Sequence, residues 1–207
     1  MIYPDIKNYC DSLVDNFNKI PVERILLLNR LVNYIQEKRE QNLPVQLVYI
    51  CTHNSRRSHF GQIWAAVAAS YYNIQNVHTF SGGTEATAFN INAINALKKT
   101  GFEIRTNDVQ TSNPKYVVQY GTYDDEHCVC FSKVYNDEVN PKSNFAAIMT
   151  CSDAEQNCPF IPGAEIRIGT TYDDPKEFDN TPFQDEKYLE RSKQIALECL
   201  YVFSNIK

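Results

Sequence analysis

An apolar run, a short polar loop and an alanine-rich segment follow one another between residues 46 and 72. The run 46–50 is typical of a buried β-strand, and residues 56–72 are predicted to form a helix. A strand that leads through a short loop into a helix is the first part of a βαβ unit. This feature restricts the chain to an α/β fold in which the strands are mostly parallel.

The same alternation continues along the chain. Parallel strands joined by helices form right-handed crossovers, and the helices cover both faces of the sheet. We therefore predict a three-layer sandwich around a mostly parallel sheet. The further predicted elements are a strand at 77–80 that ends at Ser81-Gly-Gly83, a helix at 86–99 capped by Gly101, a buried central strand at 144–149 that ends at Cys151, and a final helix at about 183–204.

Residues 1–44 are predicted to be a helical N-terminal extension. Pro21 can open a helix there, and Pro44 stops it. Because the helix has a broad apolar stripe, it must be buried against the main domain, which we favour, or in a homodimer. The stripe consists of Val22, Ile25, Leu28, Val32 and Ile35, widened by Leu26, Leu27 and Leu31.

Residues 45–207 are predicted to form the main domain, with an insert at 113–143. Two β-rich runs within the insert, 116–120 and 127–131, predict a β-hairpin. Cys128 and Cys130 lie two residues apart on the second run, so their thiols face the same side of the strand. We interpret them as half-buried thiols, and we predict no metal site and no cofactor.

The composition limits the classes of function. The chain has 207 residues and a net charge of −5, and its basic residues are scattered, which argues against a nucleic-acid surface. No apolar stretch reaches the length of a membrane span, and the N-terminus does not resemble a secretory signal. The cysteines number seven, an odd count without the spacing of a disulfide framework, which suits a reducing cytoplasm.

The loop after the first strand reads Cys51-Thr-His-Asn-Ser-Arg-Arg57-Ser58. Backbone N–H groups of such a loop and of the following helix turn point inward, where the helix dipole adds partial positive charge. Arg57 supplies a planar fork for two oxygens of a tetrahedral oxyanion. The same donors would hold Cys51 as a thiolate near neutral pH, in position to attack. The alternative is a buried cysteine that only packs.

A second cysteine segment, Cys151-Ser-Asp-Ala-Glu-Gln-Asn-Cys158-Pro159, also begins at a strand end. Ser152 and Glu155 have capping-box spacing, which predicts a short helix directly after Cys151, and Pro159 would limit it. In a helix the two cysteines would be roughly 10.5 Å apart along the axis. A disulfide needs α-carbons within about 7 Å, so the pair can bond only if the helix frays.

A third cluster is Tyr172-Asp-Asp174-Pro175. A carboxylic acid held on a proline-stiffened loop can protonate a leaving oxygen. Taken alone the cluster is equally typical of a turn.

The three clusters together resemble the low-molecular-weight protein tyrosine phosphatase superfamily, and most closely its thioredoxin-coupled arsenate reductases. The resemblance runs from about residue 46 to the C-terminus and is interrupted by the insert. It includes Ser81-Gly-Gly83, the segment from Cys151 to Cys158, and the acid loop with Asp174. The signature Cys-Thr-x-Asn-Ser-x-Arg-Ser is present as Cys51, Thr52, Asn54, Ser55, Arg57 and Ser58.

The resemblance implies a relay of thiols in residues 45–207. Cys51 would attack arsenate held by the loop and Arg57, and Asp174 would protonate the departing oxygen. Cys151 would then attack Cys51, and Cys158 would displace Cys51 to form a Cys151–Cys158 disulfide. Thioredoxin or a similar thiol reductant would reduce that bond. The family also implies that Ser58 donates to the Cys51 thiolate and that Asn54 braces the loop.

The chain departs from the family pattern at two loop positions. His53 stands where the family has glycine, so the loop is either kept with backbone strain or altered. Arg56 stands where the reductases often have a further cysteine, and it adds positive charge at the mouth of the loop.

Two other functions fit the sequence. A phosphatase that hydrolyses phosphomonoesters through a cysteinyl-phosphate needs only Cys51, Arg57 and Asp174. It has no use for Cys158, and Lys176-Glu177 follow the acid's proline where such phosphatases usually carry aromatic residues. A non-catalytic sensor of oxyanions or phosphopeptides, with the hairpin and the N-terminal helices as its interaction surface, ranks last because no catalytic residue is missing. A collapsed loop around His53 would favour it. We favour the reductase.

Overall fold

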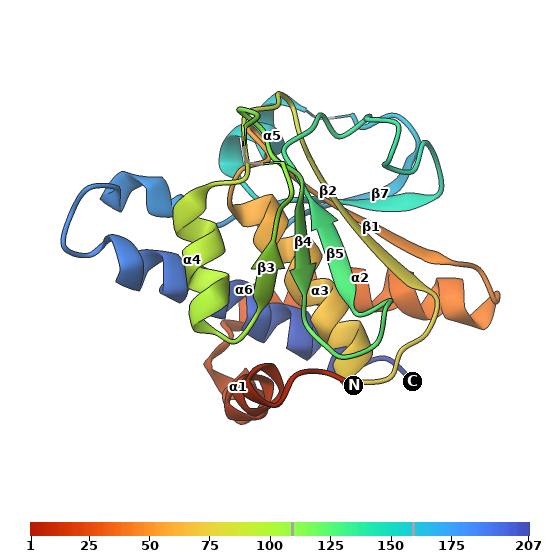
Figure 1. The fold of residues 1–207 in the computed structure, drawn as a ribbon. Coiled ribbons are helices and arrows are strands. Elements are labelled where there is room, and N and C mark those ends of the chain that lie inside the picture. Colours follow the sequence, from red (N-terminus) through yellow and green to blue (C-terminus); the bar gives the residue numbers. More distant parts are fainter. Residues whose placement is uncertain (109, 159) are drawn as a thin grey trace.

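A parallel sheet of four strands forms the centre of the computed structural model, which describes residues 1–108, 110–158 and 160–207 (Figure 1). The strand order is β2-β1-β6-β7, and every neighbouring pair is parallel. This sheet confirms the predicted α/β class. The strands are β1 (Val45–Cys51), β2 (Val77–Gly83), β6 (Phe145–Met149) and β7 (Ala164–Gly169).

Helices surround this sheet on both faces. The helices are α1 (Pro4–Val14), α2 (Val22–Glu40), α3 (Arg57–Tyr71), α4 (Ile91–Lys99), α5 (Ser152–Asn157) and α6 (Gln184–Ser204), with short 3₁₀ helices at Phe17–Lys19 and Pro175–Phe178. Within the described ranges, no helix is both long enough and apolar enough to span a membrane.

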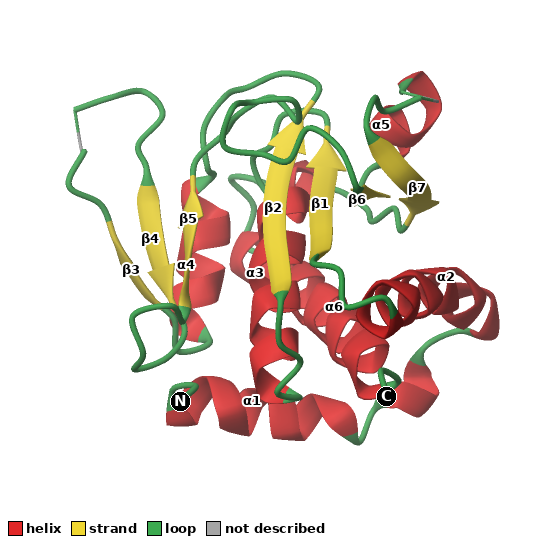
Figure 2. Cartoon of the chain, turned by 90° about the vertical axis from the view of Figure 1, so that its right-hand side faces the viewer, coloured by secondary structure: helices red, strands yellow, loops and turns green. Residues whose placement is uncertain are grey.

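The two faces of the sheet bury different layers, because alternate strand residues point to opposite sides. On β1, Leu47 and Tyr49 belong to a large core with the long helices α2, α3 and α6, which Figure 2 shows stacked together. Val48 and Ile50 belong to a smaller core with Ala154 of α5. The three predicted layers are therefore present: a thick layer of long helices, the sheet, and a thin layer that contains α5.

A second sheet contains three antiparallel strands in the order β3-β4-β5. These are β3 (Glu103–Arg105), β4 (Tyr116–Gln119) and β5 (His127–Cys130). The predicted hairpin is confirmed as β4 and β5, while β3, which pairs with it, was not predicted. Cys128 and Cys130 are buried more deeply than predicted, since both thiols face the large core.

The N-terminal helix α2 packs on α6, β1 and β7 of the same chain, as we favoured. Leu28, Leu31 and Ile35 are buried there, but the predicted stripe is wrong at its start. Val22 is 72% exposed and Leu26 is 65% exposed, because they lie on the solvent-facing side of α2, away from the side that buries Leu28.

Two further predictions need correction. Helix α4 starts at Ile91 and not at residue 86, because Asn90 caps it by accepting hydrogen bonds from the N–H groups of Asn92 and Ala93. Gly101 follows the end of α4 with a φ of 100°, as a C-terminal cap requires. Strand β7 was not predicted at all.

Candidate active site

The predicted oxyanion loop lies at the carboxyl ends of the parallel strands. Cys51 is the last residue of β1, and α3 begins at Arg57. Within the described residues, the backbone N–H groups of 53–57 donate no hydrogen bond to a backbone or side-chain acceptor. Free N–H groups at the start of a helix are suited to binding an anion.

A chain of hydrogen bonds reaches the sulfur of Cys51. Its Sγ lies 3.1 Å from Ser58 Oγ, and Asn54 Nδ2 donates to that oxygen at 2.9 Å. The backbone N–H of Lys133 donates to Asn54 Oδ1 at 2.9 Å and thereby orients the amide. Ser58 Oγ accepts from Asn54 and can donate its own proton to the sulfur. A thiolate at Cys51 would therefore receive a charge-assisted hydrogen bond.

The loop avoids the strain expected at His53. Asn54 has a positive φ of 44°, whereas His53 is not among the described residues with positive φ. Asparagine is one of the residues that adopt the left-handed region most readily. The turn thus places its left-handed residue one position after His53, and the loop is neither strained there nor collapsed.

Neighbouring segments hold the loop from outside. Ser55 Oγ donates to the carbonyl of Ala88 at 2.7 Å, and Ser132 Oγ donates to the carbonyl of His53 at 2.8 Å. His53 Nε2 lies 3.0 Å from a carboxylate oxygen of Glu85 at the rim. Ser132 belongs to the predicted insert, so the insert helps to shape the loop.

Both loop arginines contact Asp174. Arg57 Nη2 lies 2.7 Å from Asp174 Oδ2, and Arg56 Nε lies 2.8 Å from Asp174 Oδ1. Arg57 Nη1 also donates to the carbonyl of Tyr172 at 2.6 Å. Asp173, by contrast, is 91% exposed and lies 3.4 Å from Arg191. Of the two predicted acid-loop aspartates, the structure therefore brings Asp174 to the loop.

The arginines set the charge of Asp174. Burial alone would raise the pKa of this carboxyl, but the charges of Arg57 and Arg56 outweigh burial and lower the pKa below its ordinary value. Asp174 is consequently a carboxylate while it pairs with Arg57. To act as an acid, Asp174 must gain a proton. Protonation becomes easier when an oxyanion binds Arg57 and neutralises the guanidinium charge.

Cys151 lies beside the loop, at the end of the strand next to β1. Its Sγ is 3.4 Å from the hydroxyl of Thr52, the residue after Cys51. Helix α5 starts directly after Cys151, as predicted, but Ser152 is not its cap. The sulfur of Cys151 itself accepts from the N–H of Ala154 at 3.4 Å, so Cys151 is the N-cap residue.

Cys158 lies at the other end of α5 and is only half-buried. Arg167 of β7 holds that end by donating to the carbonyls of Cys158 and Glu155 and by pairing with the Glu155 carboxylate at 2.9 Å. Both cysteines are free thiols, separated by the helix. The end of this helix predicted at Pro159 lies outside the described residues.

Similarity to known proteins extends beyond these motifs, although no family model matches the chain. Arsenate reductase of Staphylococcus aureus (strain Newman) is 26% identical over 153 residues, which cover 73% of this chain and 92% of the reductase. Arsenate reductase 2 of Staphylococcus epidermidis is 27% identical over 129 residues, which cover 62% of this chain and 77% of the relative.

These similarities support the resemblance to the low-molecular-weight protein tyrosine phosphatase superfamily. Two solved structures are also similar. A low-molecular-weight phosphotyrosine phosphatase from Vibrio cholerae O395 has a TM-score of 0.49 and 14% identity, covering 77% of this chain and 94% of that one. An arsenate reductase in the phosphate binding state has a TM-score of 0.48 and 14% identity, covering 79% and 99%. The relatives are named as enzymes, which supports an enzymatic activity for this chain.

Several groups of the site could not be found from the sequence motifs. Lys133 and Ser132 reach the loop from a segment about 80 residues later, and Arg167 reaches α5 from an unpredicted strand. The only local signal was the alternation of charged and apolar residues around Arg167. Contacts made by backbone groups, such as that of Lys133, leave no signal in side-chain type.

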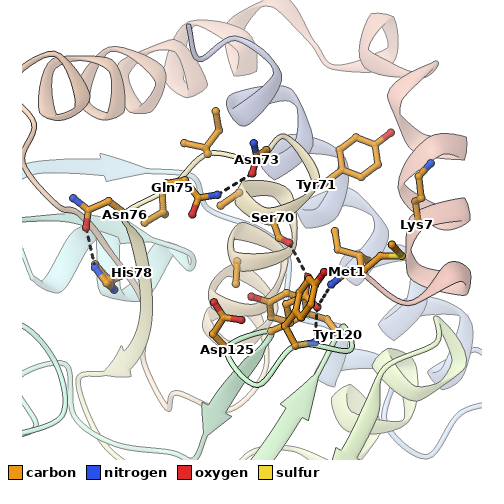
Figure 3. Close-up of a pocket in the computed structure, with 17 residues that line it drawn as sticks. Met1, Lys7, Ser70, Tyr71, Asn73, Gln75, Asn76, His78, Tyr120 and Asp125 are labelled. Carbon is orange, nitrogen blue, oxygen red and sulfur yellow. Dashed lines mark hydrogen bonds and ion pairs between the residues drawn. The ribbon is translucent and has the colours of Figure 1, made fainter.

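A cavity lies elsewhere, between the end of α3, the segment before β2 and the β4–β5 turn (Figure 3). It has a volume of about 900 Å³, and Ser70, Asn76 and Tyr120 are among its lining residues. None of the predicted site residues is among the described residues that line it. The candidate active site is therefore the loop at Cys51 and not this cavity.

Proposed function

We propose that the enzyme reduces arsenate, with Cys51 as the nucleophile and Cys151 and Cys158 as the thiols that supply electrons. The observation that carries this proposal is the contact between Cys151 Sγ and the Thr52 hydroxyl at 3.4 Å. Through this contact the buried thiol of Cys151 lies beside Thr52, the residue that follows Cys51. The names of the staphylococcal relatives support arsenate as the substrate.

The first step resembles phosphoryl transfer. The oxyanion binds to the N–H groups of 53–57 and to the guanidinium of Arg57, which exchanges its bond to Asp174 for the substrate. The Cys51 thiolate attacks arsenic and forms an S–As bond. An arsenate hydroxyl leaves as water after Asp174 donates its proton to it.

The second step transfers two electrons. The Cys151 thiolate attacks the sulfur of Cys51, an S–S bond forms, and the S–As bonding pair stays on arsenic. Arsenic(V) becomes arsenic(III) and leaves as arsenite, which takes up the proton given by Cys151. Cys158 then attacks Cys151, which returns Cys51 as a thiolate and leaves a Cys151–Cys158 disulfide. Thioredoxin, or another dithiol reductant, reduces that disulfide.

The last exchange requires movement of α5. With the helix intact, the two sulfurs stand at its opposite ends, and a disulfide cannot span roughly 10 Å along a helix. The helix is short, so unwinding it is inexpensive, but Arg167 must release the carbonyl of Cys158 first.

A phosphatase is the second candidate, because Cys51, Arg57 and Asp174 form a complete set for phosphomonoester hydrolysis. In that reaction Asp174 protonates the leaving oxygen of the ester, and water later cleaves the cysteinyl-phosphate. The sensor hypothesis has no support, since the loop around His53 is intact.

The test separates the two activities. Cys51→Ser should abolish both arsenate reduction and hydrolysis of a small aryl phosphate. Cys158→Ser should leave aryl phosphate hydrolysis unchanged and remove thioredoxin-dependent arsenate reduction, and Cys199→Ser, which changes a buried thiol on α6, is the matched control. Mass spectrometry of peptides after one equivalent of arsenate should identify a Cys151–Cys158 disulfide. Equal loss or equal retention of both activities in Cys158→Ser would contradict the reductase.

A further inference from the structure

The N-terminal extension reaches the rear of the acid loop through a buried cluster of three side chains, Arg24, Tyr172 and Glu198, here called the Arg24 cluster. Arg24 of α2 donates to both carboxylate oxygens of Glu198 of α6, at 3.0 and 2.8 Å. The hydroxyl of Tyr172 donates to the same carboxylate at 2.7 Å, and the guanidinium of Arg24 lies 4.6 Å from the ring centroid of Tyr172.

This cluster is strongly desolvated. The side chains of Arg24 and Glu198 are 14% and 4% exposed, and Tyr172 is buried. Charge-assisted bonds in such surroundings are stronger than on the surface, and they need good geometry to offset desolvation. The planar fork of Arg24 provides that geometry, and its third nitrogen donates to the carbonyl of Thr171 at 3.3 Å.

Tyr172 is thus anchored from two sides. Its side chain is held by the Arg24 cluster, and its carbonyl accepts from Arg57 in the oxyanion loop. Asp174 is two residues further along the same segment. When an oxyanion occupies Arg57, the bonds from Arg57 to Tyr172 and Asp174 weaken, and the anchor at the rear remains.

We propose that Arg24 and Glu198 are positioning residues, which hold the acid loop through Tyr172 so that Asp174 can protonate the leaving oxygen. This inference rests on the proposed role of Asp174 as the acid, and it assigns a function to the N-terminal extension. Neither Arg24 nor Glu198 touches the substrate.

The chain contains a matched control. Lys38 of α2, Tyr34 and Glu165 form a second cluster of the same kind, here called the Lys38 cluster. Lys38 Nζ lies 2.6 Å from Glu165 and 5.6 Å from the ring centroid of Tyr34, whose hydroxyl donates to Glu165 at 2.9 Å. It joins α2 to β7 and has no contact with the acid loop within the described residues.

The experiment compares phenyl phosphate, a poor leaving group that needs an acid, with 2,4-dinitrophenyl phosphate, which does not. Both members of each ion pair are changed together, since a single change would leave a buried charge unpaired and endanger the fold. The variants are Arg24→Met/Glu198→Gln and Lys38→Met/Glu165→Gln. Tyr172→Phe, which deletes one hydrogen bond and keeps the ion pair, is a milder second variant.

We expect Asp174→Asn to lower the ratio of kcat/KM for phenyl phosphate to kcat/KM for the dinitrophenyl ester by about 10²-fold, a ratio from which any change in oxyanion binding cancels. Arg24→Met/Glu198→Gln should show the same selectivity with a loss of about 10-fold, because a small displacement of the acid is enough. The Lys38 double variant should match the wild type for both esters. A structural role alone would lower both esters equally, which would overturn the proposal, as would unchanged kinetics.

Hydrogen exchange separates this inference from the proposed function. The amides of residues 171–178 should exchange faster in Arg24→Met/Glu198→Gln and, more weakly, in Tyr172→Phe, but not in the Lys38 double variant. If Asp174→Asn shows no leaving-group selectivity, the acid role fails and the proposal is overturned with it. If Asp174→Asn is selective but exchange and kinetics of the Arg24 variants equal the wild type, this inference alone is wrong.

Discussion

Removing the charge of Asp174 should make the oxyanion loop bind phosphate more tightly while it slows catalysis. In the structure the carboxylate of Asp174 pairs with the guanidinium of Arg57, the same group that would bind a tetrahedral oxyanion. Substrate and carboxylate are therefore competitors for one cation, and they also repel one another. Asp174→Asn removes both effects and leaves the N–H groups of 53–57 unchanged.

The size of the effect follows from the geometry. Asp174 Oδ2 is 2.7 Å from Arg57 Nη2, and the two side chains are 21% and 11% exposed. Unit charges about 4 Å apart in such an environment interact by about 4 kcal/mol, and the net value of a hydrogen bond to a charged group is about 1.5–3 kcal/mol. Because every 1.4 kcal/mol is tenfold, we expect the Kd of phosphate to fall by about 10- to 100-fold.

The assay is calorimetric titration of inorganic phosphate at pH 7, which needs no turnover. Asp173→Asn is the matched control, because it removes the same charge from the adjacent residue, whose side chain is 91% exposed. It should bind phosphate as the wild type does. Equal or weaker phosphate binding by Asp174→Asn would refute the competition between Asp174 and the oxyanion.

Three further outcomes are expected. Pairing with Arg57 and Arg56 lowers the pKa of Asp174 below its ordinary value of 3.8. The stability that these ion pairs add is therefore present above about pH 3.8 and is lost as the pH falls below it. Urea unfolding from pH 6 to pH 3 should show the wild type losing stability relative to Asp174→Asn, and parallel curves would count against this. Arg167→Met should speed formation of the Cys151–Cys158 disulfide by diamide about 10-fold, because the end of α5 is released, and an unchanged rate by mass spectrometry would show that Arg167 does not restrain it. Ser58→Ala should slow alkylation of Cys51 by iodoacetamide at pH 7 about 10-fold, since the thiolate loses a charge-assisted hydrogen bond; an equal rate would disprove that contribution.

Local patterns were sufficient to predict the elements that present the chemistry. The strand at 46–50, the helix that follows it and the buried strand at 144–149 all depend on short-range apolar periodicity, and the structure contains each of them. The resemblance led to Cys51, Asp174 and the cysteine segment, and the structure places all three near the same strand ends.

The edge strand of the sheet and the buried face of α2 were harder to predict. Strand β7 reads Ala-Glu-Ile-Arg-Ile-Gly, in which Glu165 and Arg167 alternate with apolar residues and pair with helices on either side. An edge strand of this kind has no continuous apolar run. The predicted stripe of α2 was too broad, since Val22 and Leu26 lie on the exposed side of the helix.

The long-range supports of the site could not be predicted from the sequence. Arg24 and Glu198 are 174 residues apart, and nothing in their local sequence distinguishes them from surface residues of two amphipathic helices. Such a pair is specified only when the packing of α2 on α6 is known. The role of Lys133 is a backbone contact, so any residue with an N–H group could supply it.

Helix α2 contacts the acid loop and also the strand that holds α5, and these two connections differ in strength. Arg24 holds the acid loop through its nearly buried ion pair with Glu198. Arg30 donates at 3.1 Å to the carbonyl of Arg167, the residue that holds the end of α5. The ion pair between Arg167 and Glu155 is more exposed, with side chains 23% and 33% accessible. Water and salt weaken the second pair far more than the first. We therefore expect α5 to open while the acid loop stays closed, which is the order that a thiol relay after the acid step requires. Hydrogen exchange in the reduced enzyme should be faster in 152–158 than in 171–175, and faster still at high salt. Equal protection of the two segments would mean that the relay cannot begin by local opening of α5.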